Sequence, residues 1–464
     1  MIEKLERIFE NKSIALLGFG REGRSTYSLF RKVFPQETIT IIDENDSVRN
    51  DALLKNDNDL QFITGIGCMQ SIDSFDIAIK SPGIPSNSFS DNLKRVSITS
   101  QTDIFLQCYG EQVIGITGTK GKSTTSSLVY HILKKAGRKT LFVGNIGIPP
   151  FDCVDEITNE TVIVMELSSH QLEYVFHAPH IAVLLNLFQE HLDHYHSYKD
   201  YQLAKLNIGK FQGKGDYFIY NYDNEALRKL IHEVPSTEQK MLPFSLEPGP
   251  HAAIHLFDDF IEMRSDSKKI KLYDISKGQP LQGHHNLYNI MAAAAACYFN
   301  GVSPENISSG IRSFKGLEHR IEPVGEYAGI LWYNDSIATI PEATIEAVKT
   351  LQNVDTLILG GFDRGIEYNI LYPFLNTSGI SNIIFVGDAG TRIMKEFTSF
   401  GNAELNFYKA DDYKQVVAIA CDVTTKGKIC LLSPAAASYD MFKNFEERGN
   451  VYKKNVRELG PSQE

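Results

Sequence analysis

One feature, a predicted strand followed by a glycine loop and a helix at residues 113–135, constrains the fold of this chain more than any other. An apolar run, VIGIT, leads into GTKGKS and then into a helical run, TTSSLVYHILKK. Such loops expose backbone N–H groups at a helix N-terminus, where they can bind phosphate. The spacing departs from the common phosphate loop, because Ile116 stands where that pattern requires its first glycine. Lys122 could still reach terminal phosphates, and Ser123 could offer a hydroxyl to Mg²⁺.

Strand and helix signals alternate along the whole chain in three blocks. Apolar strand-like runs such as IALL, TITIID and DIAIK occur in the first block, VIVME and IAVLL in the second, and TLILGG, NIIFVG and KICLL in the third. Alternation of this kind predicts parallel α/β domains. We expect a Rossmann-like N-terminal domain at residues 1–107, a central phosphate-loop ATPase domain at 108–315, and a Rossmann-like C-terminal domain at 316–464.

Charge and composition exclude several classes of protein. The formal net charge of -11 argues against a general nucleic-acid binder. No apolar run is long enough to span a bilayer, and the N-terminal MIEKLERIFENKS lacks the apolar core of a signal peptide. The six cysteines form no CxxC pair, which argues against a disulfide framework or a zinc knot. We therefore expect a cytoplasmic protein that does not bind membranes or nucleic acid.

A second glycine loop, GFGREG at residues 18–23, is a complete GxGxxG between a predicted strand and a predicted helix. Asp43 follows at the end of the next strand. Taken alone, this pattern is typical of an NAD site with an acidic residue on the ribose. Any nucleotide diphosphate could bind to such a loop, and a tight turn without a ligand remains an alternative.

Residues downstream of the phosphate loop suggest a metal site. Glu166 ends a predicted strand, where it could bind Mg²⁺. His191, His194 and His196 follow in HLDHYH, but their spacing matches no regular zinc site. His194 and His196 are predicted to be solvated loop histidines.

The stretches TGTKGKST, ELSSHQLE, NLFQEHLDHY, YQLAKLNI, GHHNLYN, GLEHR, NDSIAT and SPAAASYDMFKNFEERG occur in this order. Together they resemble the Mur ligase family, and most closely its glutamate-adding branch. The phosphate loop of that family reads GTxGK[ST], so residues 118–123 are similar to an intact loop with shortened spacing.

The resemblance implies ATP-dependent addition of glutamate to UDP-MurNAc-L-Ala through an acyl phosphate, with two Mg²⁺ ions and a monomeric enzyme. Lys122, Glu166, His191 and Lys205 are expected to be catalytic. Mg²⁺ is expected at Ser123, Glu166, His191 and Lys205, the last as a carbamate. ATP binding is expected at Gly118, Thr119, Lys120, Gly121, Lys122, Ser123, Thr124, Asn286, Asn289, Arg320 and Asp335. The UDP substrate is expected at Arg21, Glu22, Asp43, Ser81, Gly83 and Asn145, and glutamate at Thr339, Arg364, Ser438, Tyr439 and Phe445.

The sequence departs from the family pattern in the expected glutamate pocket. Ile337 stands where a lysine is usual, and Tyr439 where a leucine is common. Without that lysine one charge-assisted bond to a carboxylate is lost. D-glutamate is the expected substrate, and L-glutamate remains an alternative. Folylpolyglutamate synthesis, NAD-dependent hydride transfer and a non-catalytic phosphate-loop switch are the rival functions.

Overall fold

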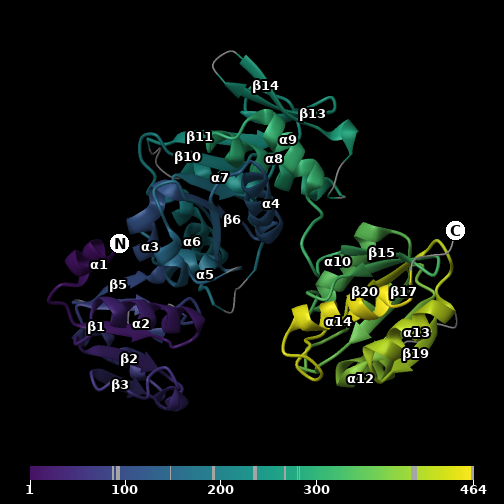
Figure 1. Cartoon of the computed structure of the whole chain (residues 1–464), viewed down its shortest axis with the longest axis horizontal. Helices are drawn as coiled ribbons and strands as arrows, with labels where there is room; N and C mark the ends of the chain where they lie inside the picture. The colour runs from purple at the N-terminus through teal and green to yellow at the C-terminus, as the bar shows by residue number, and fades with distance from the viewer. Residues whose placement is uncertain are drawn as a thin grey trace. The chain divides into compact units, whose positions relative to one another are not determined.

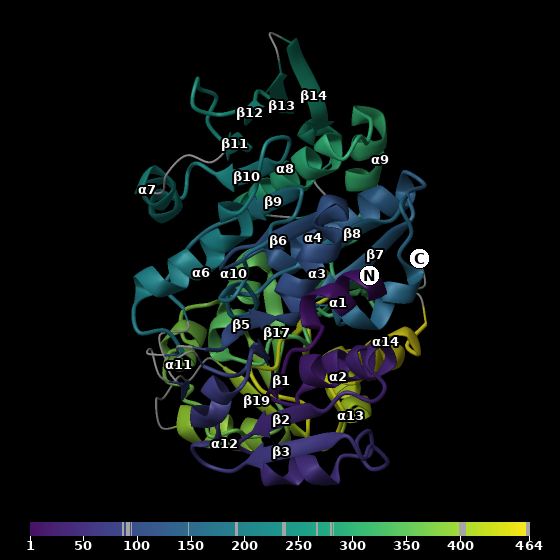
Figure 2. The ribbon, with the colours of Figure 1, turned by 90° about the vertical axis from the view of Figure 1, so that its left-hand side faces the viewer.

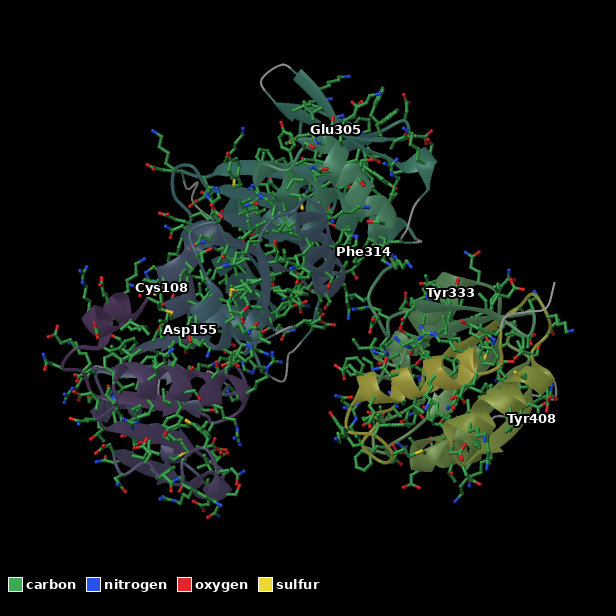
Figure 3. The ribbon with its side chains drawn as sticks, in the orientation of Figure 1. Cys108, Asp155, Glu305, Phe314, Tyr333 and Tyr408 are labelled. Atoms are coloured by element: carbon green, nitrogen blue, oxygen red, sulfur yellow. The ribbon has the colours of Figure 1, made fainter. Side chains whose placement is uncertain are left out.

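The computed structural model describes residues 1–85, 88–89, 93, 95–146, 148–190, 194–233, 238–265, 268–278, 281, 283–398 and 405–460. The chain divides into two compact units. The first comprises Met1–Pro280 and His284–Phe314, and the second comprises Leu281–Gly283 and Lys315–Glu464. Figure 3 shows the side chains that each unit carries, with Phe314 labelled in the first and Tyr333 in the second.

The first unit begins with a parallel sheet of five strands in the order β3-β2-β1-β4-β5. Its strands are β1 (Ile14–Leu17), β2 (Ile39–Asp43), β3 (Leu60–Thr64), β4 (Ile77–Lys80) and β5 (Ser97–Ser100). Every residue of β1 is buried, as expected for an inner strand covered on both faces. The helices of this part are α1 (Ile2–Phe9), α2 (Arg21–Val33) and α3 (Gln101–Tyr109), drawn in purple and blue in Figure 1.

The first unit also contains a sheet of nine strands, in the order β14-β13-β12-β11-β10-β9-β6-β8-β7, which Figure 2 shows from β14 down to β7. Its strands are β6 (Val113–Thr117), β7 (Thr140–Gly144), β8 (Val162–Glu166), β9 (Ile181–Leu184), β10 (Tyr217–Asn221), β11 (Lys240–Ser245), β12 (Ile254–Phe257), β13 (Phe260–Ser265) and β14 (Lys268–Asp274). Strands β6 to β12 pair in parallel, whereas β12, β13 and β14 pair antiparallel.

The helices around this sheet place the phosphate loop. They are α4 (Lys122–Lys135), α5 (Ser169–Leu172), α6 (Tyr198–Lys210), α7 (Glu225–Glu233), α8 (His284–Phe299) and α9 (Pro304–Ser313). Helix α4 packs against β6, β7 and β8 and against α8 and α9. The alanine run at residues 292–296 is fully buried in α8, because small side chains let this helix approach its neighbours closely.

The second unit is a sheet of six strands in the order β15-β16-β20-β17-β18-β19, antiparallel only between β15 and β16. Its strands are β15 (Glu322–Tyr327), β16 (Ile330–Asn334), β17 (Val354–Gly360), β18 (Asn382–Val386), β19 (Asn406–Ala410) and β20 (Ile429–Leu432). Its helices are α10 (Pro341–Leu351), α11 (Leu371–Leu375), α12 (Gly387–Thr398), α13 (Tyr413–Val423) and α14 (Phe445–Arg457). Helix α14 packs against α13, β15 and β16.

The predicted α/β class is confirmed, and each apolar run named in the sequence corresponds to a strand, from β1 at Ile14–Leu17 to β20 at Ile429–Leu432. The antiparallel strands β12 to β14 were not predicted. Their residues, such as those in IEMRS and KKIKLYD, mix charged and apolar side chains and carry no long apolar run.

Candidate functional site

The phosphate loop lies between the carboxyl end of β6 and the first turn of α4. A Cβ atom on Gly121 would come within 2.4 Å of Oδ1 of Asn289, and φ at Gly121 is +84°, so only glycine suits this position. Lys122 Nζ donates to the carbonyl oxygens of Gly118 at 3.0 Å and Thr119 at 2.9 Å. The lysine therefore lies over the loop whose N–H groups could bind phosphate.

Helix α8 brings two of the predicted ATP residues to the same loop. Asn289 Nδ2 donates to Oδ1 of Asn286 at 2.9 Å, and Oδ1 of Asn289 accepts from Oγ1 of Thr125 at 3.2 Å. Residues 289 and 121 are far apart in sequence and adjacent in space. The structure thus brings together the predicted ATP residues of the first unit.

Glu166 ends β8, the strand beside β6, and its side chain is fully buried. Oε1 accepts from Nδ2 of Asn145 at 2.8 Å, whereas Oε2 has no hydrogen-bond partner among the residues that the structure describes. A buried carboxylate oxygen without a partner suits a hard cation such as Mg²⁺. Ser123 lies in the first turn of α4, which packs against β8.

Lys205 projects from α6 toward the phosphate loop and is 2% exposed. Nζ donates to the carbonyl oxygen of Gly118 at 2.9 Å and lies 5.0 Å from the ring centroid of Tyr201. Burial, and then the charge of Lys122, hold the pKa of Lys205 well below its usual value. Lys205 is therefore a buried amine beside the loop rather than the surface charge that its helix alone would indicate.

His191 lies outside the described residues. Within the described ranges no group of three or more His, Cys, Asp or Glu side chains could hold a metal ion. The unpaired Oε2 of Glu166 is therefore the structural feature that supports a metal site here.

The prediction that His194 is a solvated loop histidine was wrong, whereas His196 is exposed as predicted. The His194 side chain is 9% exposed, and Nε2 lies 2.5 Å from Oε1 of Glu173. Oε2 of Glu173 accepts from Nζ of Lys80 at 2.7 Å, and both side chains are buried. A chain of charged and polar groups thus links the end of β4 to the segment after residue 193.

The first glycine loop is closed by its own acidic residue. Oδ2 of Asp43 accepts from the backbone N–H of Phe19 at 2.8 Å, and Oδ1 accepts from that of Asn45 at 2.9 Å. Ser81 Oγ donates to the carbonyl oxygen of Gly18 at 2.9 Å. One carboxylate oxygen of Asp43 therefore stabilises the glycine loop and the other stabilises the segment after β2, which argues against the ribose contact of an NAD site.

Glu22 in the same loop contacts helix α5 through Gln171, a residue that the sequence analysis did not single out. Oε1 of Glu22 accepts from Nε2 of Gln171 at 2.6 Å, and burial raises the pKa of Glu22. Gln171 also completes a capping box with Ser168 at the start of α5. The S-x-x-Q pattern in ELSSHQLE was the available signal for this cap.

The second unit carries Asp335 directly after β16. Oδ2 accepts from Oγ of Ser433 at 2.7 Å, and Oδ1 from the backbone N–H of Ile321 at 3.2 Å. Burial nevertheless raises the pKa of Asp335 to about 7, against the lowering effect of these bonds and of the Arg320 charge. The Arg320 side chain itself is exposed.

The expected glutamate residues come from several segments of this unit. Arg364 Nη2 donates to the carbonyl oxygen of Thr339 at 2.8 Å. Tyr439 is 66% exposed, and its ring lies 6.3 Å from that of Phe362. The carbonyl oxygen of Phe445 accepts from Ser336 Oγ at 2.8 Å.

Arg448 connects the two loops of this region and was missed by the sequence analysis. Its guanidinium donates to Ser336 Oγ and to the carbonyl oxygens of Ser336, Ala436 and Ala437 at 2.7–3.0 Å, and the side chain is buried. It thereby joins the NDSIAT loop to the SPAAAS loop. The arginine of FEERG was a visible signal, but nothing local indicated that it is buried.

Comparisons with known proteins extend over the whole chain. Residues 116–297 match the family model described as the Mur ligase middle domain. A UDP-N-acetylmuramoylalanine--D-glutamate ligase of Acetivibrio thermocellus is 31% identical over 99% of this chain and 99% of its own length. A protein of the same name from Clostridioides difficile is 32% identical over 97% of this chain and 99% of its own.

A solved structure gives an independent measure of the fold. The MurF ligase from Thermotoga maritima in complex with ADP matches with a TM-score of 0.54 and 18% identity, over 91% of this chain and 96% of that one. This likeness shows a shared fold. Within the described part of the chain, no helix has both the length and the apolar character needed to cross a membrane.

Proposed function

The chain belongs to the Mur ligase family, and we propose that it joins D-glutamate to UDP-N-acetylmuramoyl-L-alanine in peptidoglycan synthesis, with ATP converted to ADP and phosphate. The full-length relatives carry this activity in their names. The observation that carries the proposal is the arrangement of Lys122, Lys205 and the unpaired oxygen of Glu166 around one phosphate loop. Phosphoryl transfer needs cationic groups and metal ligands close to the phosphates, because they stabilise the negative charge of the transition state.

The reaction has two chemical steps. The carboxylate of the muramoyl-alanine substrate attacks the γ-phosphorus of ATP, which forms an acyl phosphate and releases ADP. The amino group of glutamate then attacks the acyl carbon, and the resulting tetrahedral intermediate expels phosphate. Anionic charge accumulates in both steps, so fixed cations and N–H donors lower the barrier.

Each predicted residue has a task in this proposal. Lys122 and the N–H groups of the 118–123 loop bind the ATP phosphates. Ser123, Glu166, His191 and Lys205, the last as a carbamate, would hold two Mg²⁺ ions, which supply charge neutralisation when bound. The burial of Lys205 supports this assignment, because burial lowers the pKa of the amine and a carbamate forms only from an unprotonated amine.

The remaining predicted residues complete the proposal. Lys120 and Thr124 belong to the ATP loop, and Arg320 and Asp335 act on ATP from the second unit. Arg21, Glu22, Asp43, Ser81, Gly83 and Asn145 hold the UDP substrate, with Asp43 acting through the loop that it closes. Thr339, Arg364, Ser438, Tyr439 and Phe445 hold glutamate.

We further propose three domains, at residues 1–107, 108–315 and 316–464. Each range contains one of the three sheets, which supports this division. We also propose that the enzyme acts as a monomer. A cytoplasmic location is proposed with it, because the proposed substrates are nucleotides.

The full chain should be incubated with UDP-MurNAc-L-Ala, Mg-ATP and either D- or L-glutamate. Phosphate release should require all three substrates, and the product should gain the mass of one glutamyl residue. Phosphate release without the muramoyl substrate would contradict the proposal. Activity with L-glutamate alone would favour the alternative that Ile337 raises.

The NAD alternative has a separate test. Because Asp43 is engaged by Phe19 and Asn45, NADH should show no saturable binding in a fluorescence titration, whereas UDP-MurNAc-L-Ala should bind. The reverse result would restore the dehydrogenase interpretation.

A further inference from the structure

Arg320 is presented by a backbone segment of unusual conformation, which we call the Arg320 loop (residues 317–322). His319 and Ile321, on either side of Arg320, have φ angles of +62° and +46°. L-residues rarely adopt this region, and a β-branched residue does so only as an outlier. Such strain persists where surrounding contacts over-determine the backbone, often at functional sites. Within the described residues, the exposed Arg320 side chain forms no hydrogen bond or ion pair.

The two strained residues are each held by a carboxylate. The backbone N–H of His319 donates to Oε2 of Glu322 at 2.8 Å. The backbone N–H of Ile321 donates to Oδ1 of Asp335 at 3.2 Å. The backbone of the Arg320 loop is therefore fixed on both sides of its arginine, by the loop's own last residue, Glu322, and by Asp335 after β16.

Glu322 is held in turn by Lys453 of α14. Oε1 of Glu322 accepts from Nζ of Lys453 at 2.9 Å, while Oε2 also accepts from Nδ2 of Asn334 at 2.8 Å. The side chains of Lys453 and Glu322 are only 6% and 15% exposed. Removing one partner of such a pair leaves the other charge buried and uncompensated.

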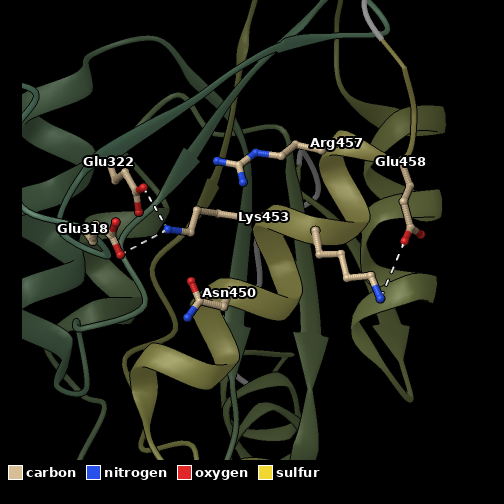
Figure 4. A pocket seen from close by; sticks show the side chains of 7 residues that line it. Glu318, Glu322, Asn450, Lys453, Arg457 and Glu458 are labelled. Atoms are coloured by element: carbon tan, nitrogen blue, oxygen red, sulfur yellow. Dashed lines mark hydrogen bonds and ion pairs between the residues drawn. The ribbon is translucent and has the colours of Figure 1, made fainter.

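Figure 4 shows this pair at the wall of an open cavity of about 560 Å³. Lys453 points between Glu318 and Glu322. Its neighbour Lys454 pairs instead with Glu458 at 3.9 Å. The Lys454 side chain is 77% exposed. Helix α14 thus carries one buried lysine that reaches the Arg320 loop and an adjacent lysine that does not.

His319 adds a second contact between α14 and the loop. Nδ1 of His319 lies 2.9 Å from Nδ2 of Asn334, which can donate to it only if Nδ1 carries no proton. Burial and the charge of Lys453 lower the pKa of His319, consistent with a neutral ring. A Cβ atom on Gly449 of α14 would lie 2.1 Å from Nδ1, so the helix packs directly on this ring.

We propose that Lys453 and Glu322 are positioning residues that hold the Arg320 loop in its strained conformation, so that Arg320 binds the phosphates of ATP. This inference rests on the proposed function, in which Arg320 contacts ATP. The pair touches neither substrate. Its effect is to orient the arginine before ATP arrives, which reduces the entropy lost on binding.

Steady-state kinetics of the full-length enzyme with each substrate varied in turn test this proposal. Lys453→Met should raise KM for ATP at least about tenfold, with KM for UDP-MurNAc-L-Ala changed less than about twofold. Lys453→Arg should restore most of the ATP affinity, because its guanidinium can pair with the same carboxylate. Lys454→Met is the matched control and should leave both constants unchanged.

Circular dichroism shows whether each variant is folded. If Lys453→Met does not fold, Glu322→Gln decides, since the amide keeps its neutral contacts but loses the charge that pairs with Lys453. A folded variant with normal KM for ATP would overturn the proposal, as would an equal loss in Lys454→Met. Failure of the unmodified enzyme to ligate would instead overturn the proposed function.

Discussion

The side-chain nitrogen of Lys205 lies 2.9 Å from the carbonyl oxygen of Gly118, in the loop that precedes α4. This contact places a lysine of helix α6 against the phosphate loop that joins β6 to α4. Burial of the amine, and then the charge of Lys122, lower the pKa of Lys205 well below the usual value. A neutral amine can form the anionic carbamate that Mg²⁺ would bind.

Lys205→Ala is expected to lower ligation by at least about a hundredfold, because an anionic ligand beside the phosphates is lost. Short carboxylic acids such as formate or acetate should restore part of the activity by occupying the vacated space. Phosphate release with and without these acids measures the effect. Lys199→Ala, on the exposed face of the same helix, is the control. Full activity of Lys205→Ala without additives would exclude the role.

Lys122→Ala is expected to lower turnover by about a thousandfold or more while the fold stays intact, because Lys122 neutralises the transferring phosphoryl group. Thermal unfolding should be close to that of the unmodified enzyme. Lys134→Ala, at the exposed far end of α4, should retain normal turnover. Near-normal turnover of Lys122→Ala would remove this loop from the site.

Asp335 should make the second unit more stable at acidic pH. Burial raises its pKa to about 7, above the usual 3.8, so the folded state binds a proton more tightly than the unfolded state. The free energy of unfolding therefore falls as pH rises through this range, by on the order of 2 kcal/mol from pH 5 to pH 8. Asp335→Asn should remove this contribution.

Trp332 offers the measurement for this prediction. It is the single tryptophan of the chain, and it lies buried on β16 of the second unit. Urea unfolding followed by its fluorescence at several pH values should give a steeper pH dependence for the unmodified protein than for Asp335→Asn. Identical slopes would show that Asp335 does not titrate in this range.

Ile337→Lys is expected to change the ratio of D- to L-glutamate turnover by at least about tenfold, roughly 1.4 kcal/mol. The enantiomers present their carboxylates in mirror-related directions, so a pocket that fixes the amine can satisfy both carboxylates of only one of them. A misplaced, desolvated carboxylate is costly. Phosphate release with each enantiomer on both proteins measures the ratio. An unchanged ratio would place residue 337 outside the selective contacts.

The sequence by itself determined the strand–loop–helix units and the family. The phosphate loop is local: Val113–Thr117, four loop residues and Lys122–Lys135 are contiguous, and their apolar pattern and glycines predict the arrangement directly. The inner strands are equally local, because parallel strands covered on both faces are continuous apolar runs. The order of the motif stretches along the whole chain then indicated the Mur ligase family.

Only the tertiary structure decided which charged side chains are buried and with which partners. Lys205 is an ordinary helix lysine until α6 packs beside the phosphate loop. Lys453 and Glu322 are 131 residues apart, and Lys80 and Glu173 are 93 apart. No local pattern reports such pairs, because burial and ion pairing depend on how distant elements pack. The burial and pairing of the charged side chains are therefore a property of the fold rather than of any motif.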